Sequence, residues 1–215
     1  MNKKILIVGG SGHGRVAEEI LQENGYDVVG FLDDNLPISG KILGGIRDIK
    51  NICKSNSIDA IFIAIGDNST RYNISLQIKL YIDDIDYINV ISKYSYISPS
   101  VSIGYGNFIG HGCIINTNCS LGNFCILNTS CSLDHDSILD DYSSLAPKVV
   151  TGGNFSLGKF SAICIGSVII HNISIGSSCV VGASSLVLSN ISDNQLVYGS
   201  PSKFIKNRYF NDRYL

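Results

Sequence analysis

Charged residues are scarce in this chain of 215 residues. Asp, Glu, Lys and Arg make up 16% of the sequence, and the formal net charge is -2. Proteins that bind nucleic acid or an anionic membrane surface usually present a basic surface, and this composition provides none. Ile, Ser, Gly and Asn are abundant instead, which favours a β-rich fold with many turns.

Long apolar runs are also missing. No segment approaches the roughly 20 apolar residues that a membrane-spanning helix requires. The first residues, MNKKILIVGGSG, are basic and then aliphatic, but only four aliphatic residues precede the glycines, which is too few for a signal peptide. We therefore expect a soluble, cytoplasmic protein that is long enough for one large domain or two small ones.

The seven cysteines lack the spacing of a metal or redox motif. No pair stands in a CxxC arrangement, which argues against a zinc site of that kind. Without a secretion signal, thiols are expected rather than disulfides. Five of the seven recur at one phase of the repeat described next, which indicates small side chains packed inside a fold. These five are Cys113, Cys119, Cys125, Cys131 and Cys179.

The second half of the chain has a six-residue period. From Ile97 to Val187 an aliphatic residue stands at every sixth position, and Thr151 is the one exception. Glycine, Asn or Asp often follows the aliphatic residue, as is typical of turns, and a small residue often stands four positions after it. A fixed internal period indicates a solenoid. The pattern resembles that of hexapeptide-repeat β-helices, in which three six-residue sides form one coil. That resemblance implies that positions 97 to 187, which span 90 residues, form five coils of 18.

The first half of the chain has a different pattern. Short apolar runs in KKILIVGG, YDVVGFLDD, DAIFIAIGDN and DIDYINVI alternate with helical patterns in SGHGRVAEEILQENG, IRDIKNICKSN and TRYNISLQIKL. Strands that alternate with helices predict a small parallel α/β sheet. We place the domain boundary near Ser92, so that residues 1–92 form an α/β domain. Residues 93–215 then form the repeat domain and a C-terminal tail.

A glycine-rich turn, IVGGSGHG, joins the first predicted strand to the first predicted helix. Such a turn lets backbone N–H groups approach a phosphate or another polar group, and His13 lies within it. Asp33 and Asp34 follow about 20 residues later, where a dinucleotide-binding fold bonds a ribose hydroxyl. The GxGxxG pattern is incomplete, because Arg15 stands where its last glycine would be. The residues alone leave a nucleotide-containing ligand, a nicotinamide cofactor and a structural turn open.

One histidine stands between two aspartates within the repeat, in LDHDS. His135 lies two positions after Leu133, at a phase that points outward from a solenoid. A carboxylate neighbour favours the imidazolium ion and orients the ring, so His135 and Asp136 suit general base catalysis near neutral pH. A solvated turn histidine is the alternative. His171 shares the phase of His135, but two coils separate them by about 10 Å, too far for one zinc ion. We expect no metal.

Five motifs, in order, resemble those of one known family. GGSGHG, FLDD, AIGDN, LNTSCSLDHD and GSPSK, with the hexapeptide solenoid, are similar to bacterial sugar acyltransferases of the sialic acid O-acetyltransferase (NeuD) type. Within that family the chain looks most like the PglD-type N-acetyltransferases of nucleotide-linked 4-amino sugars. The resemblance covers nearly the whole chain. It implies a left-handed parallel β-helix, whose handedness the period alone does not fix, and a homotrimer with active sites between subunits.

The resemblance also implies a reaction and a set of site residues. Acetyl would move from acetyl-CoA to the amino group of a nucleotide-linked 4-amino-4,6-dideoxy sugar, for a surface glycan. His135 would be the general base, and Asp136 would raise its basicity. Nucleotide-sugar contacts would fall on Ser11, Gly12, His13, Asp33, Asp34 and Gly66. Coenzyme A contacts would fall on Gly153, Ile165, Ala183, Lys203 and Ser144, the last of which stands where related enzymes often carry a second histidine.

Other functions remain compatible with the residues. O-acetylation of a sugar such as sialic acid would use the same base, and a non-catalytic nucleotide-sugar-binding scaffold would leave its ligand unchanged. A nicotinamide oxidoreductase would account for the first domain but not for the coils. The tail KFIKNRYFNDRYL either closes over coenzyme A phosphates, with Lys203 and Lys206 nearest to them, packs on a neighbouring subunit, or is a partly ordered terminus.

Overall fold

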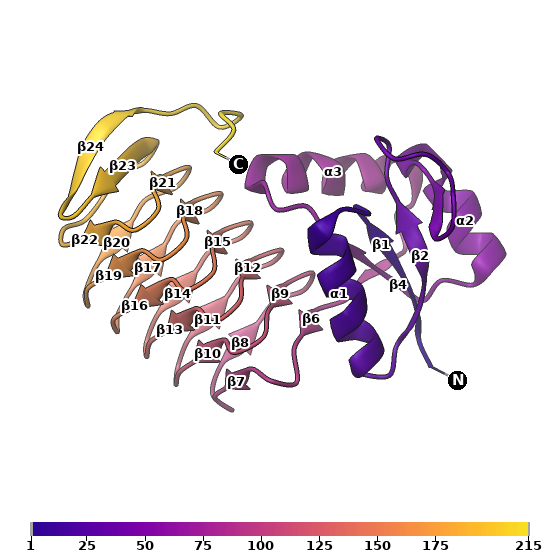
Figure 1. Ribbon diagram of the computed structural model, residues 1–215, viewed down its shortest axis with the longest axis horizontal. Helices are drawn as coiled ribbons and strands as arrows, with labels where there is room; N and C mark the ends of the chain where they lie inside the picture. Colours follow the sequence, from indigo (N-terminus) through magenta and orange to yellow (C-terminus); the bar gives the residue numbers. More distant parts are fainter. Residues whose placement is uncertain (1, 215) are drawn as a thin grey trace.

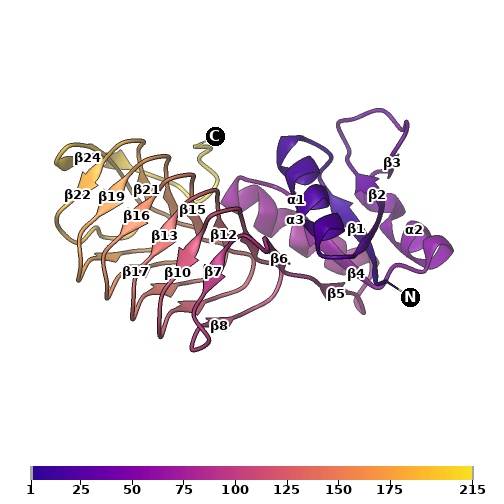
Figure 2. The same cartoon turned by 60° about the horizontal axis from the view of Figure 1, so that its bottom comes forward.

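The computed structural model describes residues 2–214 and has two parts, an α/β domain and a three-sided β-helix (Figure 1). The coils of the β-helix stack away from the α/β domain, and the C-terminal segment returns along the β-helix toward helix α3. Figure 2 shows the same coils from another side, with the α/β domain at one end of the stack. No helix in the described range is long and apolar enough to cross a membrane.

The N-terminal domain is the predicted small parallel α/β unit. Its five strands are arranged in the order β3-β2-β1-β4-β5, and every neighbouring pair is parallel. Strands β1 and β4 are buried almost throughout, which explains why their sequences are continuous apolar runs. The strands are β1 (Lys4–Val8), β2 (Asp27–Leu32), β3 (Ile42–Gly44), β4 (Ala60–Ile63) and β5 (Asp86–Tyr87). The helices are α1 (Gly12–Glu23), the 3-10 turn η1 (Ile46–Asp48), α2 (Ile49–Asn56) and α3 (Asn68–Tyr81).

Two details of this domain differ from the sequence prediction. Strand β3 is not indicated by the sequence, because three residues are too few to show a period. The segment DIDYINVI, predicted as one strand, contains two: β5 pairs with β4, whereas β6 (Val90–Ile91) pairs with β9 in the β-helix. The chain changes sheets at Asn89, whose side chain donates a hydrogen bond to the carbonyl oxygen of Gly104 (2.7 Å). Pairing within the β-helix therefore begins at Val90.

The β-helix consists of three sheets, which we number I to III. Sheet I contains β6, β9 (Phe108–Ile109), β12 (Ile126–Leu127), β15 (Ser144–Leu145), β18 (Ala162–Ile163), β21 (Val180–Val181), β23 (Gln195–Gly199) and the antiparallel β24 (Ser202–Asn207). Sheet II contains β7 (Tyr96–Ile97), β10 (Ile114–Ile115), β13 (Ser132–Leu133), β16 (Val150–Thr151), β19 (Val168–Ile169) and β22 (Leu186–Val187). Sheet III contains β8 (Ser102–Ile103), β11 (Ser120–Leu121), β14 (Ile138–Leu139), β17 (Ser156–Leu157) and β20 (Ser174–Ile175).

The strand register confirms the six-residue period. Ile114 pairs with Ser132 and Ser120 pairs with Ile138, so each coil advances by 18 residues over three sides. The second residue of most strands points inward, which places the repeated aliphatic residues in one continuous core. The five cysteines of the repeat lie in this core and are 0–1% exposed, as predicted. They pack as small side chains inside the prism.

The corners of the β-helix use a left-handed residue at every sixth position. Turn geometry is predicted at the glycines that follow the aliphatic residues, but the left-handed residue stands two positions after them. At Gly152, for example, an added Cβ would lie 2.6 Å from the backbone nitrogen of His171, so glycine there makes room for the next coil. The corner residues with positive φ, other than glycine, include Asn118, Phe124, Ser130, Asp136, Tyr142, Lys148, Asn154, Phe160, Asn172, Ser178 and Ser184.

The outward face of sheet I joins the two domains. Its first outward residues, Val90, Phe108 and Ile126, are buried in a cluster with residues of β1, α1 and β4. Further along the stack, the corner between sheets III and I carries Tyr142 and Phe160, whose rings stack 5.6 Å apart. Tyr72 and Phe210 from elsewhere in the chain pack edge-on against this pair. The α/β domain therefore rests against one side of the β-helix and leaves sheets II and III uncovered in the chain.

Candidate active site

A cavity of about 740 Å³ lies where the α/β domain, sheet I and the C-terminal segment meet. Its floor is the outward face of sheet I beyond the domain junction, together with the corner between sheets I and II. The C-terminal segment supplies Lys206 and residues between Arg208 and Tyr214. Five of the residues predicted to contact ligands line it together: His13, Gly66, Ser144, Ile165 and Ala183.

The α/β domain contributes its topological switch point to this cavity. The strand order reverses at β1, and in parallel sheets ligands bind in the crevice beyond the carboxyl ends of the strands at such a point. The turn after β1 and the loop after β4 approach closely there: Gly9 has φ +106°, and an added Cβ would lie 2.8 Å from the carbonyl oxygen of Ala64. This close approach places His13 and Gly66 on the same wall.

His13 is a largely buried residue rather than a solvent-facing one. Its ring packs edge-on against Phe108, with ring centroids 4.5 Å apart. Burial, and then the positive charge of Arg71, lower the pKa of His13 to about 4, so the imidazole is neutral near pH 7. Among residues 2–214, no group forms a hydrogen bond with its Nε2 atom. A neutral imidazole with a free ring nitrogen suits a hydrogen bond to a polar ligand.

Four other residues predicted to meet the nucleotide sugar lie near this crevice but do not line the cavity. Asp33 accepts a hydrogen bond from a backbone N–H of the glycine-rich turn (2.9 Å), and Asp34 accepts one from the first residue of η1 (2.9 Å). Ser11 and Gly12 form the exposed start of α1. The two carboxylates, which follow β2, thus connect its loop to the loops after β1 and β3.

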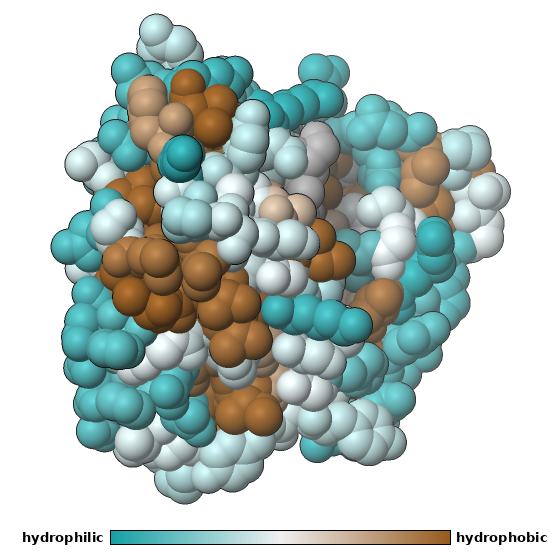
Figure 3. Space-filling view, turned by 60° about the vertical axis from the view of Figure 1, so that its left-hand side comes forward, coloured by the Kyte–Doolittle hydropathy of each residue, from teal (hydrophilic) through white to brown (hydrophobic). Residues whose placement is uncertain are grey.

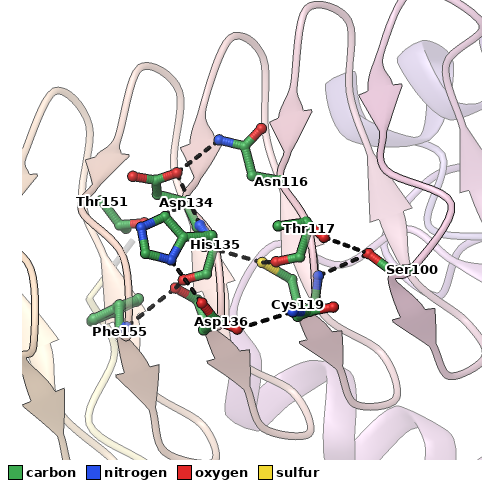
Figure 4. Close-up of polar contacts among 11 residues, drawn as sticks. Ser100, Asn116, Thr117, Cys119, Asp134, His135, Asp136, Thr151 and Phe155 are labelled. Carbon is green, nitrogen blue, oxygen red and sulfur yellow. Dashed lines mark hydrogen bonds and ion pairs between the residues drawn. The ribbon is translucent and has the colours of Figure 1, made fainter.

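His135 and Asp136 form a hydrogen-bonded pair on the outside of the β-helix, at the corner between sheets II and III (Figure 4). Nδ1 of His135 lies 2.8 Å from Oδ2 of Asp136, and the His135 side chain is 48% exposed. The predicted outward orientation is therefore confirmed. The hydrogen bond to Asp136 raises the pKa of His135 above its ordinary value, and the same bond lowers the pKa of Asp136.

Three residues that the sequence analysis does not nominate hold this loop. The side-chain amides of Asn116 and Asn118, one coil earlier, donate to Asp134 (2.7 Å) and Asp136 (3.2 Å). One coil later, the hydroxyl of Thr151 accepts a hydrogen bond from the backbone nitrogen of Asp134 (3.2 Å). Thr151 is the one polar residue in the aliphatic series, and its hydroxyl binds the backbone of the loop that carries His135 (Figure 4). That break in the repeat is the signal that could have identified it.

Two residues predicted to contact coenzyme A lie outside the cavity lining. Gly153 occupies the position of His135 one coil later, and an added Cβ would collide with the His135 ring. Glycine at this position gives the imidazole its space. Lys203 is exposed on β24, whereas Lys206 lies on the cavity wall. Within residues 2–214, no three His, Cys, Asp or Glu side chains are grouped so that they could hold a metal ion.

The cavity and His135 lie at opposite edges of sheet II in this chain. The cavity occupies the corner between sheets I and II, through residues such as Ala146 and Ile165, and His135 occupies the corner between sheets II and III. His135 does not line the cavity. A single chain therefore presents a binding cavity on one edge and a basic imidazole on another.

Comparisons with known proteins match both parts of the chain. Residues 4–78 match the family model of the PglD N-terminal domain. A variant of perosamine N-acetyltransferase from Caulobacter crescentus, in complex with CoA and GDP-perosamine, is 26% identical in sequence. The alignment covers 95% of this chain and 97% of that one, with a TM-score of 0.90. The acetyltransferase domain of PglB from Neisseria gonorrhoeae, in complex with acetyl coenzyme A, is 27% identical, with coverages of 95% and 100% and a TM-score of 0.87.

A curated relative matches only part of the chain. The uncharacterized protein L142 of Acanthamoeba polyphaga mimivirus is 36% identical over 109 residues, which is 49% of this chain and 21% of that protein. The match thus spans about a fifth of the length of the relative.

Fold and site together define a hexapeptide-repeat protein, a left-handed parallel β-helix with an α/β domain at its N-terminus. The fold predicted from the sequence is therefore confirmed. Within this class, residues 4–78 match the PglD N-terminal domain, and 95% of the chain is similar to perosamine N-acetyltransferase and to the PglB acetyltransferase domain, in agreement with the resemblance that its five motifs indicate.

Proposed function

We propose that the protein is an acetyl-CoA-dependent N-acetyltransferase that acts on the 4-amino group of a nucleotide-linked 4-amino-4,6-dideoxy sugar. The observation that carries this proposal is the His135–Asp136 pair on the outer edge of the β-helix. Relatives that match both domains of the chain bind CoA with GDP-perosamine, or acetyl coenzyme A, which supports the choice of substrates. We place the reaction in the cytoplasm, and its product would serve the synthesis of a surface glycan.

The geometry of the pair fits the proton transfer that this reaction needs. The amine attacks the thioester carbonyl, a C–N bond forms, the C–S bond breaks, and the nitrogen loses a proton. With the Nδ1–H group of His135 donated to Asp136, Nε2 is free to accept that proton and then pass it to the departing thiolate. General base catalysis of this kind contributes about 10²–10⁴-fold to the rate.

The cavity has the chemistry of a coenzyme A site. Apolar side chains such as Ala162 and Val180 form its floor, and Lys206 and Arg213 place positive charge on its wall. Coenzyme A combines a long, weakly polar arm with phosphates, and these two kinds of surface suit its two ends. His13 and Gly66 bring the nucleotide-sugar domain to the same cavity, so both substrates would meet there.

We further propose that three chains assemble around sheet II. Its outward side chains are apolar apart from Ser132, and most are exposed, with Val150 at 45% and Val168 at 42%. Figure 3 shows apolar surface gathered on one face of the molecule. Sheet III, by contrast, carries hydrogen-bonded serines such as Ser156 and Ser174 in its outward row. An exposed apolar patch beside a polar face is typical of an interaction surface. The outward residues of sheet II are Tyr96, Ile114, Ser132, Val150, Val168 and Leu186.

Assembly through sheet II supports an active site shared between subunits. In a cyclic trimer each contact is heterologous, so one edge of a subunit faces a different edge of its neighbour. The two edges of sheet II carry the cavity and His135, respectively. Packing of sheet II against its copies would bring His135 of one subunit toward the cavity of the next. This arrangement explains why neither edge forms a complete site in one chain.

The proposed reaction is tested by measuring thiol release from acetyl-CoA in the presence of nucleotide-linked sugars. The panel contains 4-amino sugars linked to GDP, UDP or dTDP, the matching 4-hydroxy sugars, and sialic acid. We expect rapid turnover with at least one 4-amino sugar and little with its hydroxyl counterpart, because an amine is the better nucleophile. Preferential turnover of a hydroxyl acceptor would instead indicate an O-acetyltransferase, and the absence of turnover with every acceptor would favour a binding scaffold.

Replacing Asp136 with Asn is expected to shift the pH dependence of acetyl transfer to lower pH. The base is active when His135 is unprotonated, so activity falls as the pH decreases through the pKa of His135. Asp136 raises that pKa, and its loss lowers it, so the acidic limb of the kcat/KM profile moves downward. Asp140→Asn, at another corner, serves as the control and should leave the limb in place. An unchanged limb in Asp136→Asn would show that this pair does not set the pH dependence.

A further inference from the structure

Ser144 is the one polar side chain in the outward row formed by the two-residue strands of sheet I, β6 to β21. It stands on the cavity floor and is 8% exposed. Its neighbours in the row are apolar and pack against the α/β domain or line the cavity, so a hydroxyl here is surrounded by apolar surface. Buried hydroxyls are normally hydrogen-bonded, and their partners decide in which direction they donate. The row is Val90, Phe108, Ile126, Ser144, Ala162 and Val180.

Asn68, the first residue of α3, reaches Ser144 from the α/β domain. Its side-chain Nδ2 lies 3.2 Å from the Ser144 hydroxyl oxygen and also donates to the carbonyl oxygens of Phe160 (3.3 Å) and Ser161 (3.1 Å). Asn68 is 1% exposed. All three partners belong to the β-helix, so this one amide group links the two domains next to the cavity.

Arg71, one turn later on α3, fixes the orientation of that amide. A guanidinium only donates hydrogen bonds, so the atom of Asn68 that faces Nη2 of Arg71 at 2.6 Å is the carbonyl oxygen Oδ1. The amide nitrogen must then face Ser144. Arg71 is itself 1% exposed, and each of its five N–H groups has an acceptor. The other acceptors are the carbonyl oxygens of Ile65, Gly66, Phe124 and Tyr142.

The direction of these bonds determines what Ser144 can do. Because Ser144 accepts a hydrogen bond from Asn68, its own hydrogen is left to donate elsewhere. The hydroxyl of Tyr214 lies 3.5 Å away, longer than the usual O–H···O distance of about 2.5–3.0 Å, so it holds the Ser144 hydrogen only weakly. The Ser144 hydrogen is therefore available to an oxygen atom of a ligand in the cavity.

We propose that Arg71 and Asn68 are positioning residues that fix Ser144 as a hydrogen-bond donor to a carbonyl oxygen of acetyl-CoA. This inference rests on the proposed function, which supplies the ligand. Acetyl-CoA has carbonyl groups in its pantetheine arm and in its thioester, and both accept a hydrogen bond in the same way. The α/β domain thus acts on the acetyl-CoA side of the reaction, through Asn68, as well as on the nucleotide sugar.

The test compares Ser144→Ala, Asn68→Asp and the double variant in steady-state kinetics. Ser144→Ala removes the donor. Asn68→Asp places a carboxylate beside Arg71 that accepts the Ser144 hydrogen and turns it away from the ligand. We expect each single variant to lose about fivefold to tenfold in kcat/KM for acetyl-CoA, the effect of one hydrogen bond. The double variant should be no worse than Ser144→Ala by more than about twofold, because both changes remove the same donor.

Three further measurements separate the loss of the hydrogen-bond donor from a loss of protein stability. Ser156→Ala changes the corresponding serine of sheet III and should behave like wild type. Asn68→Ala frees Ser144 to adopt either orientation and should lose less activity than Asn68→Asp. Binding of CoA without the acetyl group, measured by calorimetry, separates the two acceptors: weaker binding in Ser144→Ala indicates a pantetheine carbonyl, and unchanged binding with lower kcat indicates the thioester.

Several results would overturn the inference. Wild-type kinetics for Ser144→Ala would show that the hydroxyl does not donate to the ligand. If the fold losses in kcat/KM of the two single variants multiplied in the double variant, Asn68 would act only on the domain junction. A purely structural effect of Asn68 is independent of Ser144. A wild-type protein without turnover would contradict the proposed function instead. Binding of acetyl-CoA would then still test the donor, since weaker binding by Ser144→Ala than by wild type supports it and unchanged binding contradicts it.

Discussion

Replacement of His135 with Ala is expected to lower kcat/KM for acetyl transfer by about 10²- to 10⁴-fold, the contribution typical of a general base. The fold should be unaffected, because the side chain is exposed and touches mainly its own loop. Thiol release from acetyl-CoA, with the best acceptor of the sugar panel, measures the effect.

His171→Ala is the matched control for this experiment. His171 stands at the same corner and the same phase as His135, two coils further along, but Asn172 follows it in place of an aspartate. It lies exposed and forms no pair of the His135–Asp136 kind in the described structure. We expect wild-type activity. If His135→Ala retained more than about a tenth of the wild-type rate, the base would have to be another group or the substrate amine would lose its proton to water.

Two inactive variants are expected to restore activity when they assemble together. His135→Ala lacks the base, and Ala183→Trp fills the cavity from an exposed position that tolerates a large side chain. In mixed trimers some interfaces combine an intact His135 from one chain with an intact cavity from the next. With random assembly, about one interface in four is functional, so co-expressed chains should recover about a quarter of wild-type activity.

The control for complementation is co-expression of two differently tagged His135→Ala chains, which must remain inactive. The mass of the purified assembly, measured by light scattering, establishes that the chains associate. If each site were formed within one chain, every mixed trimer would contain only defective sites and no activity would return. With association established, that result would contradict the shared site.

Much of the fold can be predicted from the sequence, because the six-residue period directly indicates the stacked coils. A coil of the β-helix must place an inward aliphatic residue at each side, so the period of six appears as a simple series from Ile97 to Val187. The outward orientation of His135 follows from the same series. The short strand β3 and the divided segment around Asn89 escape prediction, because two or three residues carry no measurable period.

The sequence by itself therefore determines the two-part architecture, the buried cysteines and the pairing of His135 with Asp136, which are set by local spacing. Only the tertiary structure shows that Gly153 makes space for the imidazole, that Thr151 holds its loop, and that Asn68 meets Ser144. These contacts join residues 17 to 76 positions apart in the chain. Such contacts arise when coils stack and when α3 docks on sheet I. The period predicts that the coils stack but not which side chains bond across them, and no local pattern encodes the docking of α3.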